Sequence, residues 1–160
     1  MGFNKELNTW NIGAGRILVV LVPARHGCQD TVIINCYQRA KGDRAEILDH
    51  LRRICMSSIQ SRQANIILGS DFNASLADTR TGYVADPLKK EHDAQLRQFC
   101  NTPILGRRWM AGNAPPHQHS YHTYDASKSA LLDGIFVMTS QGSRSICTLD
   151  NPSLKCLVIG

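Results

Sequence analysis

The order of the apolar segments along the chain constrains its fold more than any other feature. Two runs rich in β-branched residues, 16–22 and 31–37, predict buried strands, and the turn-forming residues between them predict an antiparallel hairpin. A helical pattern follows, then a short strand at 65–68, a second helix, and a late strand at 131–138. This order indicates an α/β (α+β) domain in which helices pack on one face of a mixed sheet.

The helices carry their own start signals. Asp43, with a glutamate three residues later, forms a capping box before a helix whose apolar residues recur on one face: Ile47, Leu48, Leu51, Ile54, Cys55 and Ile59. Arg44 is expected to lie away from much of that face and to stay in water. The second helix is expected to begin at Pro87, because proline fits the first helical position. Two short strands at 145–149 and 156–159 are expected to close the sheet.

The charge balance favours an acidic partner. Lysine and arginine number 18 against 13 aspartates and glutamates, so the net charge is +5. A basic balance is typical of proteins that bind nucleic acid, although many soluble proteins are mildly basic. The six cysteines form no C-x-x-C pair, which disfavours a structural zinc site and indicates thiols in a reducing intracellular compartment, with the nucleus and the mitochondrion both open. The longest apolar run is too short to cross a membrane.

The segment with most chemical content begins where the strand at 65–68 runs into Gly-Ser-Asp-Phe-Asn. Asp71 and Asn73 are two residues apart, so an extended backbone would point both side chains to the same side. An aspartate at a strand end can ligate a hard cation or accept a proton from water, and an asparagine beside it can orient a phosphate oxygen. The bland alternative is a simple turn, which Asp and Asn often make. His117 and His119 have spacing suited to a transition metal or to a polar loop.

Three segments of the chain together resemble motifs of the endonuclease/exonuclease/phosphatase superfamily. Residues 69–73 resemble its G-D-F-N motif, and 33–37 resemble the strand that ends in its active-site tyrosine. Thr123-Tyr124, followed by 132–137, resembles its late T-Y/W … I-D-Y-I-F-V segment. The endonuclease domains of non-long-terminal-repeat retrotransposons are the most similar branch. The resemblance implies the second half of that domain, a partial four-layer sandwich over 16–160.

The resemblance also implies roles for four residues. Asp71 would be the metal-proximal carboxylate or base that activates water, with Asn73 orienting it and a phosphate oxygen. Tyr37 would hydrogen-bond the scissile phosphate, and Asp133 would be the supporting carboxylate on the late strand. The chemistry implied is hydrolysis of a phosphoester assisted by Mg²⁺ or Mn²⁺, with the metal held in part by Asp71.

The chain departs from the family pattern in three places. Residues 1–15 form a polar lead with no strand, so Glu6 is not assigned as the family's metal-binding glutamate, and no early asparagine is identified. The family's final S-D-H corresponds to Ser153-Leu154-Lys155, and its arginine before the late aspartate corresponds to Leu131. Magnesium takes about six oxygen ligands, including waters, and only one or two of the family's set are present. The sequence therefore predicts little or no hydrolysis by this chain alone.

Three functions follow from these observations. The first is a non-catalytic domain that acts as a structural or RNA-binding subunit of a larger assembly, with a protein partner covering the exposed face of its sheet. The second is a metal-dependent endonuclease or phosphodiesterase for DNA or RNA, completed by ligands from elsewhere. The third is a phosphatase for a small phosphorylated molecule, because a fold does not determine its substrate. The departures from the family pattern, above all Ser153-Leu154-Lys155, and the basic charge favour the first, whereas the retained Asp71, Asn73, Tyr37 and Asp133 favour the second.

Overall fold

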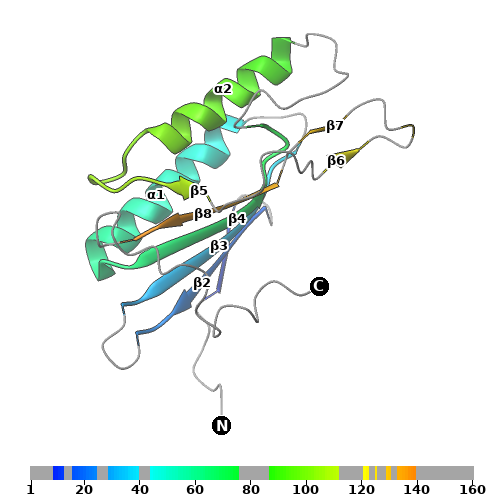
Figure 1. Ribbon diagram of the computed structural model, residues 1–160. Helices are drawn as coiled ribbons and strands as arrows, with labels where there is room; N and C mark the ends of the chain where they lie inside the picture. Colours follow the sequence, from blue (N-terminus) through cyan, green and yellow to red (C-terminus); the bar gives the residue numbers. More distant parts are fainter. Residues whose placement is uncertain are drawn as a thin grey trace.

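The structure, a computed structural model, describes nine stretches of the chain: residues 9–12, 16–24, 29–39, 44–75, 87–111, 121–122, 125, 129–130 and 133–139. Six strands form one mixed sheet in the order β1-β2-β3-β4-β8-β5. They are β1 (Thr9–Ile12), β2 (Ile17–Val22), β3 (Thr31–Tyr37), β4 (Asn65–Asp71), β5 (Met110–Ala111) and β8 (Asp133–Met138). The short strands β6 (Tyr121–His122) and β7 (Ser129–Ala130) pair separately (Figure 1).

The centre of the sheet joins segments that are far apart in sequence. β2 and β3 form the expected antiparallel hairpin, and β3 then pairs in parallel with β4. A parallel pair needs a long crossover, and α1 (Arg44–Arg62) provides it. β8 adds to the other side of β4 in the antiparallel direction, so the late strand lies beside the strand that carries Asp71.

Both helices lie on the same face of the sheet (Figure 1). α1 begins one residue after Asp43, and α2 (Pro87–Asn101) begins at the proline, as the start signals predict. α1 stops where Gln63 adopts a left-handed backbone with φ of 49°, which a helix cannot continue. The α/β (α+β) class, with a mixed sheet and helices on one face, is therefore confirmed.

The core lies between the helices and the strand residues that point toward them. Every second residue of β2, β3 and β4 is buried, which is the period-two pattern of a sheet covered on one face. α1 contributes Ile47, Leu51, Cys55 and Ile59, and α2 contributes Leu96 and Phe99. Beneath α2, the ring of Phe136 meets those of Phe72 and Trp109 edge to face, with centroids 5.7 and 6.4 Å apart.

Some expectations differ from the structure. β1 lies inside the segment expected to be a polar lead, because Thr9–Ile12 pairs with β2 although its own sequence is only weakly strand-like. The two expected closing strands, at 145–149 and 156–159, lie outside the described residues, as do His117 and His119. In the described part of the chain, no helix combines the length and apolar character that a membrane span requires.

Candidate functional site

Three of the four residues singled out by the sequence stand side by side across the sheet. In the parallel pairing of β3 with β4, Tyr37 is the register partner of Asp71. In the antiparallel pairing of β4 with β8, Asp71 is the register partner of Asp133. Adjacent strands are about 4.8 Å apart, so the three backbone positions form one short row at an edge of the sheet. The fourth residue, Asn73, follows two residues beyond the end of β4.

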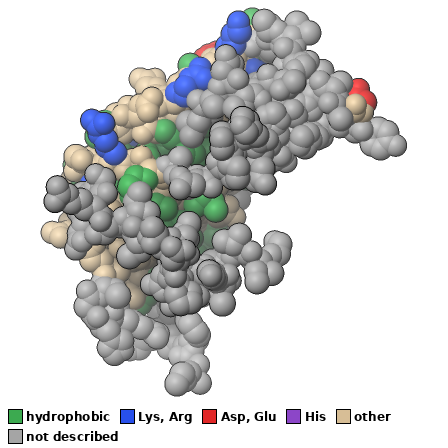
Figure 2. Space-filling view, in the orientation of Figure 1, with side chains coloured by type: hydrophobic (Ala, Val, Ile, Leu, Met, Phe, Trp, Pro, Cys, Tyr) green, Lys and Arg blue, Asp and Glu red, His purple; other side chains and the backbone are tan. Residues whose placement is uncertain are grey.

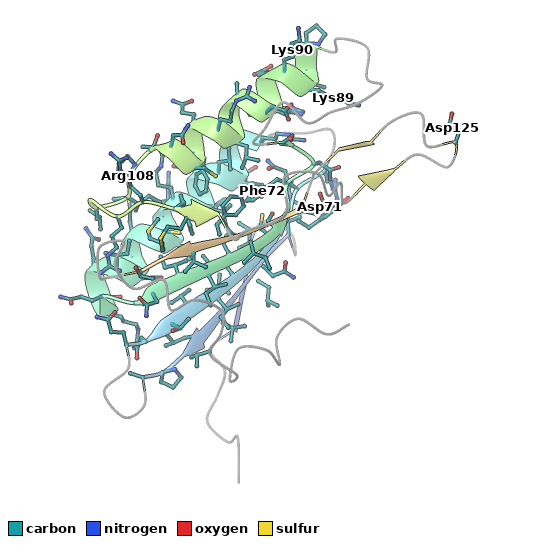
Figure 3. The ribbon with its side chains drawn as sticks, in the orientation of Figure 1. Asp71, Phe72, Lys89, Lys90, Arg108 and Asp125 are labelled. Carbon is teal, nitrogen blue, oxygen red and sulfur yellow. The ribbon has the colours of Figure 1, made fainter. Side chains whose placement is uncertain are left out.

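The row opens on the face of the sheet that the helices do not cover. Cys36 and Ser70 are buried toward the helices, so their neighbours Tyr37 and Asp71 point to the opposite face. Tyr37 is 52% exposed, so about half of this residue is open to solvent on that face. Asp71 is partly buried at the end of its strand (Figure 3).

The turn after Asp71 is closed by its own side chain. Oδ1 of Asp71 accepts a hydrogen bond from the Asn73 backbone N–H at 2.9 Å, which makes an Asx-turn. Asn73 has a φ of 47°, a left-handed conformation that asparagine tolerates better than most residues. Its Nδ2 donates to the Gln38 carbonyl at 2.6 Å. The expectation that Asp71 and Asn73 extend to the same side was therefore wrong, because the chain turns between them and Asn73 holds the end of β3.

A buried arginine supports this turn from the helix side. Arg44 at the start of α1 is only 4% exposed. Its Nη1 donates to the Phe72 carbonyl at 2.9 Å, and its Nη2 donates to the Asn73 carbonyl at 3.0 Å. The expectation that Arg44 stays in water was wrong, because the turn offers two carbonyls that the planar guanidinium reaches together. Its place at the first helical position, three residues before the buried Ile47 and so on the same side of the helix, was the only sequence signal.

Two further contacts that the sequence analysis missed fix the neighbouring backbone. Asp93 of α2 is buried, and its Oδ1 accepts a hydrogen bond from the Ser75 N–H at 2.7 Å. The Ser70 hydroxyl donates to the Cys36 carbonyl at 2.8 Å and so ties β4 to β3 one residue before the row. The turn is thus held by β3, by α1 and by α2. A charged residue among the buried positions of an amphipathic helix is the signal that would have identified Asp93.

A solvent-open hollow of about 600 Å³ lies over the row. Asn35, Tyr37, Gly69, Asp71 and Ile135 are among the residues that line it. Gly69 lies on β4, between β3 and β8, and has open space where a Cβ would stand. The absence of a side chain at this position therefore deepens the hollow. The hollow has room for a phosphate group and parts of the molecule that carries it.

The donor chemistry around the hollow is limited. Burial raises the pKa of the Cys36 thiol to about 11, so this residue is neither a thiolate ligand nor a nucleophile at neutral pH. Among the described residues, no group of three or more His, Cys, Asp and Glu stands close enough to hold a metal ion. The register brings two aspartates, Asp71 and Asp133, to adjacent positions. Two carboxylates alone supply fewer oxygens than the roughly six that Mg²⁺ takes, so the remaining ligands would be waters or groups from a bound molecule.

The open face beside the hollow is apolar. Leu18 and Val22 are each 41% exposed, and Ile135 is 57% exposed. Partly buried residues of the same face lie between them: Val20, Ile33, Ile67 and Val137. No helix or strand of the described stretches packs on this side of the sheet (Figure 1).

The fold expected from the resemblance is confirmed, as a fold alone, by a solved endonuclease domain. The endonuclease domain of TRAS1, a telomere-specific non-LTR retrotransposon, is similar with a TM-score of 0.54 and 16% identity, over 86% of this chain and 57% of that domain. This chain therefore spans a little over half the length of that domain. Humanized D. rerio TDP2 and the human Nocturnin catalytic domain each give a TM-score of 0.45 and 13% identity, over 79% and 82% of this chain and 46% and 44% of theirs. No protein-family model and no curated protein matches the sequence.

Proposed function

We propose that this chain is a non-catalytic domain with an endonuclease/exonuclease/phosphatase fold that serves as a structural or nucleic-acid-binding subunit, with RNA the favoured nucleic acid. One observation carries the proposal: the sheet exposes Leu18, Val22 and Ile135 on a face that no described element covers. An apolar patch of this kind is typical of a surface that packs against a partner. The net charge of +5 supports contact with a polyanion in the same assembly.

The partner-binding role of the open face can be tested with two adjacent residues of β2. Leu18 is 41% exposed on the open face, whereas Ile17 is fully buried under the helices. We expect Leu18→Thr to change the free energy of unfolding by less than about 0.5 kcal/mol, as for surface substitutions, and to reduce binding of a hydrophobic dye. Ile17→Thr is the matched control and should destabilise by about 2 kcal/mol or more. Equal destabilisation by both substitutions would show that the chain already covers this face by itself.

An active metal-dependent phosphodiesterase is the second candidate, and a specific observation favours it. Tyr37, Asp71 and Asp133 occupy one row, and the Asx-turn keeps Asp71 in a defined conformation beside the hollow. When bound there, Mg²⁺ or Mn²⁺ would neutralise phosphate charge, with Asp71 as its ligand and Asp133 as a second carboxylate position. Asn73 would act indirectly on this site, because its amide is engaged by the Gln38 carbonyl.

A plasmid-nicking assay with Mg²⁺ and with Mn²⁺ separates the two candidates. Asp71→Asn keeps the shape of the side chain and removes the charge. Asp49→Asn removes the same charge from the exposed side of α1 and serves as the control. If the chain is non-catalytic, the wild type and Asp71→Asn should give the same nicking background. Calorimetry should likewise detect the same metal binding, or none, for both proteins. Nicking by the wild type and by Asp49→Asn, but not by Asp71→Asn, would establish the enzyme instead.

A further inference from the structure

The outer surface of α2 is basic along its length. Lys90 and Arg97 are seven residues apart, so they lie on the same side of the helix and about 10 Å apart along its axis. Arg108 is exposed and lies beside the C-terminal end of α2, whereas Lys89 and Lys90 mark the other end (Figure 3). Lys90, Arg97 and Arg108 are called the α2 ridge below. Lysine and arginine side chains follow this edge of the molecule in Figure 2.

The ridge differs from two cations at or near the surface of α1 in how the charges are balanced. On α1, Arg53 pairs with Asp49 at 2.8 Å, and Arg62 pairs with Asp30 at 3.1 Å. Within the described stretches, none of the three ridge cations makes such a pair. α2 contains two acidic residues, but Asp93 is buried against Ser75. The other, Glu91, is exposed and accepts a hydrogen bond from the neutral Gln95 side chain, so it keeps its charge, but the three ridge cations outnumber it. The ridge therefore keeps a net positive charge that a partner can use.

The ridge also lies away from the hollow. α2 packs on the face of the sheet opposite to the one on which Tyr37 and Asp71 open (Figure 1). A nucleic acid bound along the ridge would thus not depend on the residues that line the hollow. Successive phosphates of one duplex strand rise about 3.4 Å along the axis, so Lys90 and Arg97 match phosphates about three apart.

We propose that the α2 ridge binds the phosphodiester backbone of a nucleic acid, as a contact surface separate from the Asp71 hollow. The proposal rests on the nucleic-acid-binding role proposed above. It names the surface that performs that role. Recognition would be electrostatic and independent of base sequence, because backbone contacts carry no sequence information. Binding releases counterions, so its affinity should fall steeply with salt, by a logarithmic slope of about 0.9 for each neutralised duplex phosphate and about 0.7 for single strands.

The test compares two double variants of equal net charge. Lys90→Gln/Arg97→Gln removes two cations of the ridge, and Arg53→Gln/Arg62→Gln removes two cations that are already paired with carboxylates. Glutamine has nearly the helix propensity of lysine and arginine, so both variants should fold, and circular dichroism with thermal denaturation checks this. Affinity for a fluorescent single-stranded RNA and for a DNA duplex of equal length is measured from about 50 to about 200 mM salt.

The ridge variant is expected to lose about 1.4 to 1.8 units of salt slope, because it lacks two phosphate contacts. The salt range is fourfold, and each contact contributes a slope of about 0.7 to 0.9. The ratio of the affinity at low salt to the affinity at high salt should therefore be about 7- to 12-fold smaller for the ridge variant than for the wild type. The control variant and Asp71→Asn should keep the wild-type slope. The relative affinities of the two probes then show whether RNA or DNA is the preferred ligand.

Other outcomes overturn the proposal in distinguishable ways. If the wild type binds and the ridge variant keeps its slope, the ridge is not the surface, but the nucleic-acid-binding role stands. If the wild type binds neither probe, that role fails together with the ridge. If a labelled polyglutamate peptide binds through Lys90 and Arg97 while neither nucleic acid does, the ridge serves an acidic protein instead.

Discussion

The contact between Arg44 and the turn after β4 gives the most demanding test of the structure. Replacing Arg44 with methionine keeps the length of an unbranched side chain and removes the guanidinium. The guanidinium loses two short hydrogen bonds, to the Phe72 and Asn73 carbonyls at 2.9 and 3.0 Å, and a longer one, to the Arg39 carbonyl at 3.5 Å. The two short bonds set the expected loss. A hydrogen bond that involves a charged group contributes about 1.5 kcal/mol at the low end, so the variant should lose about 3 kcal/mol of the free energy of unfolding. For a chain of this size, that loss lowers the melting temperature by about 6 to 12 °C.

Denaturant titration monitored by circular dichroism measures the loss, and two companion variants locate its origin. Arg44→Lys keeps a charge but offers one compact ammonium in place of a planar fork, so it should recover about half of the lost stability. Arg53→Met, on the same helix, removes an arginine whose side chain is 74% exposed and should cost less than about 1 kcal/mol. Hydrogen exchange at the Asn73 amide should accelerate only in the Arg44 variants. A cost below about 1 kcal/mol for Arg44→Met would refute the reasoning, because the turn would then not depend on the guanidinium.

Three more predictions concern charge, thiol reactivity and packing. The hydrogen bond from the Ala24 N–H and the nearby Arg62 lower the pKa of Asp30. Its carboxylate therefore stabilises the fold above its unfolded pKa near 3.8, and this contribution is lost as the pH falls through the lower folded pKa. In urea titrations, the difference in stability between the wild type and Asp30→Asn should be full at neutral pH and should close toward pH 3. Burial raises the pKa of the Cys36 thiol to about 11, so iodoacetamide at pH 8 should label this residue only after unfolding. Mass spectrometry of peptides measures the labelling, and labelling of the folded protein would contradict the burial of Cys36. A Cβ at Gly134 would stand 2.7 Å from the Phe136 ring, so Gly134→Ala should lower the free energy of unfolding by about 1 to 3 kcal/mol. The substitution should also alter the fluorescence of Trp109, whose ring contacts that of Phe136. An unchanged spectrum and stability would show that the Phe136 ring moves freely.

The fold was predictable because its signals are local. The two runs of β-branched residues, the apolar spacing in α1 and the proline at the start of α2 each act within one or two turns of chain. They were correct for β2, β3, α1 and α2. β1 escaped detection because Thr9–Ile12 is short and is a strand only through its pairing with β2. Propensity is a weak guide where tertiary pairing decides the conformation.

The candidate site was predictable only as a set of residues. Tyr37, Asp71 and Asp133 were each identified beforehand from the motifs they resemble, but spacing along the chain does not show that they share one row. That row depends on the register of β3 with β4 and of β4 with β8, which joins residues more than 30 positions apart in sequence. A shift by one residue would turn each strand's side chains to the other face.

The sequence by itself determined which segments become strands and helices and which polar residues stand at the strand ends, because these properties follow from the period of apolar residues and from short-range backbone preferences. The tertiary structure alone decided that Arg44 is buried under the Asp71 turn, that Asn73 turns back to Gln38, and that one face of the sheet stays apolar and exposed. Each of these outcomes requires partners that come from other elements, and their free energies exist only once the sheet and helices have assembled.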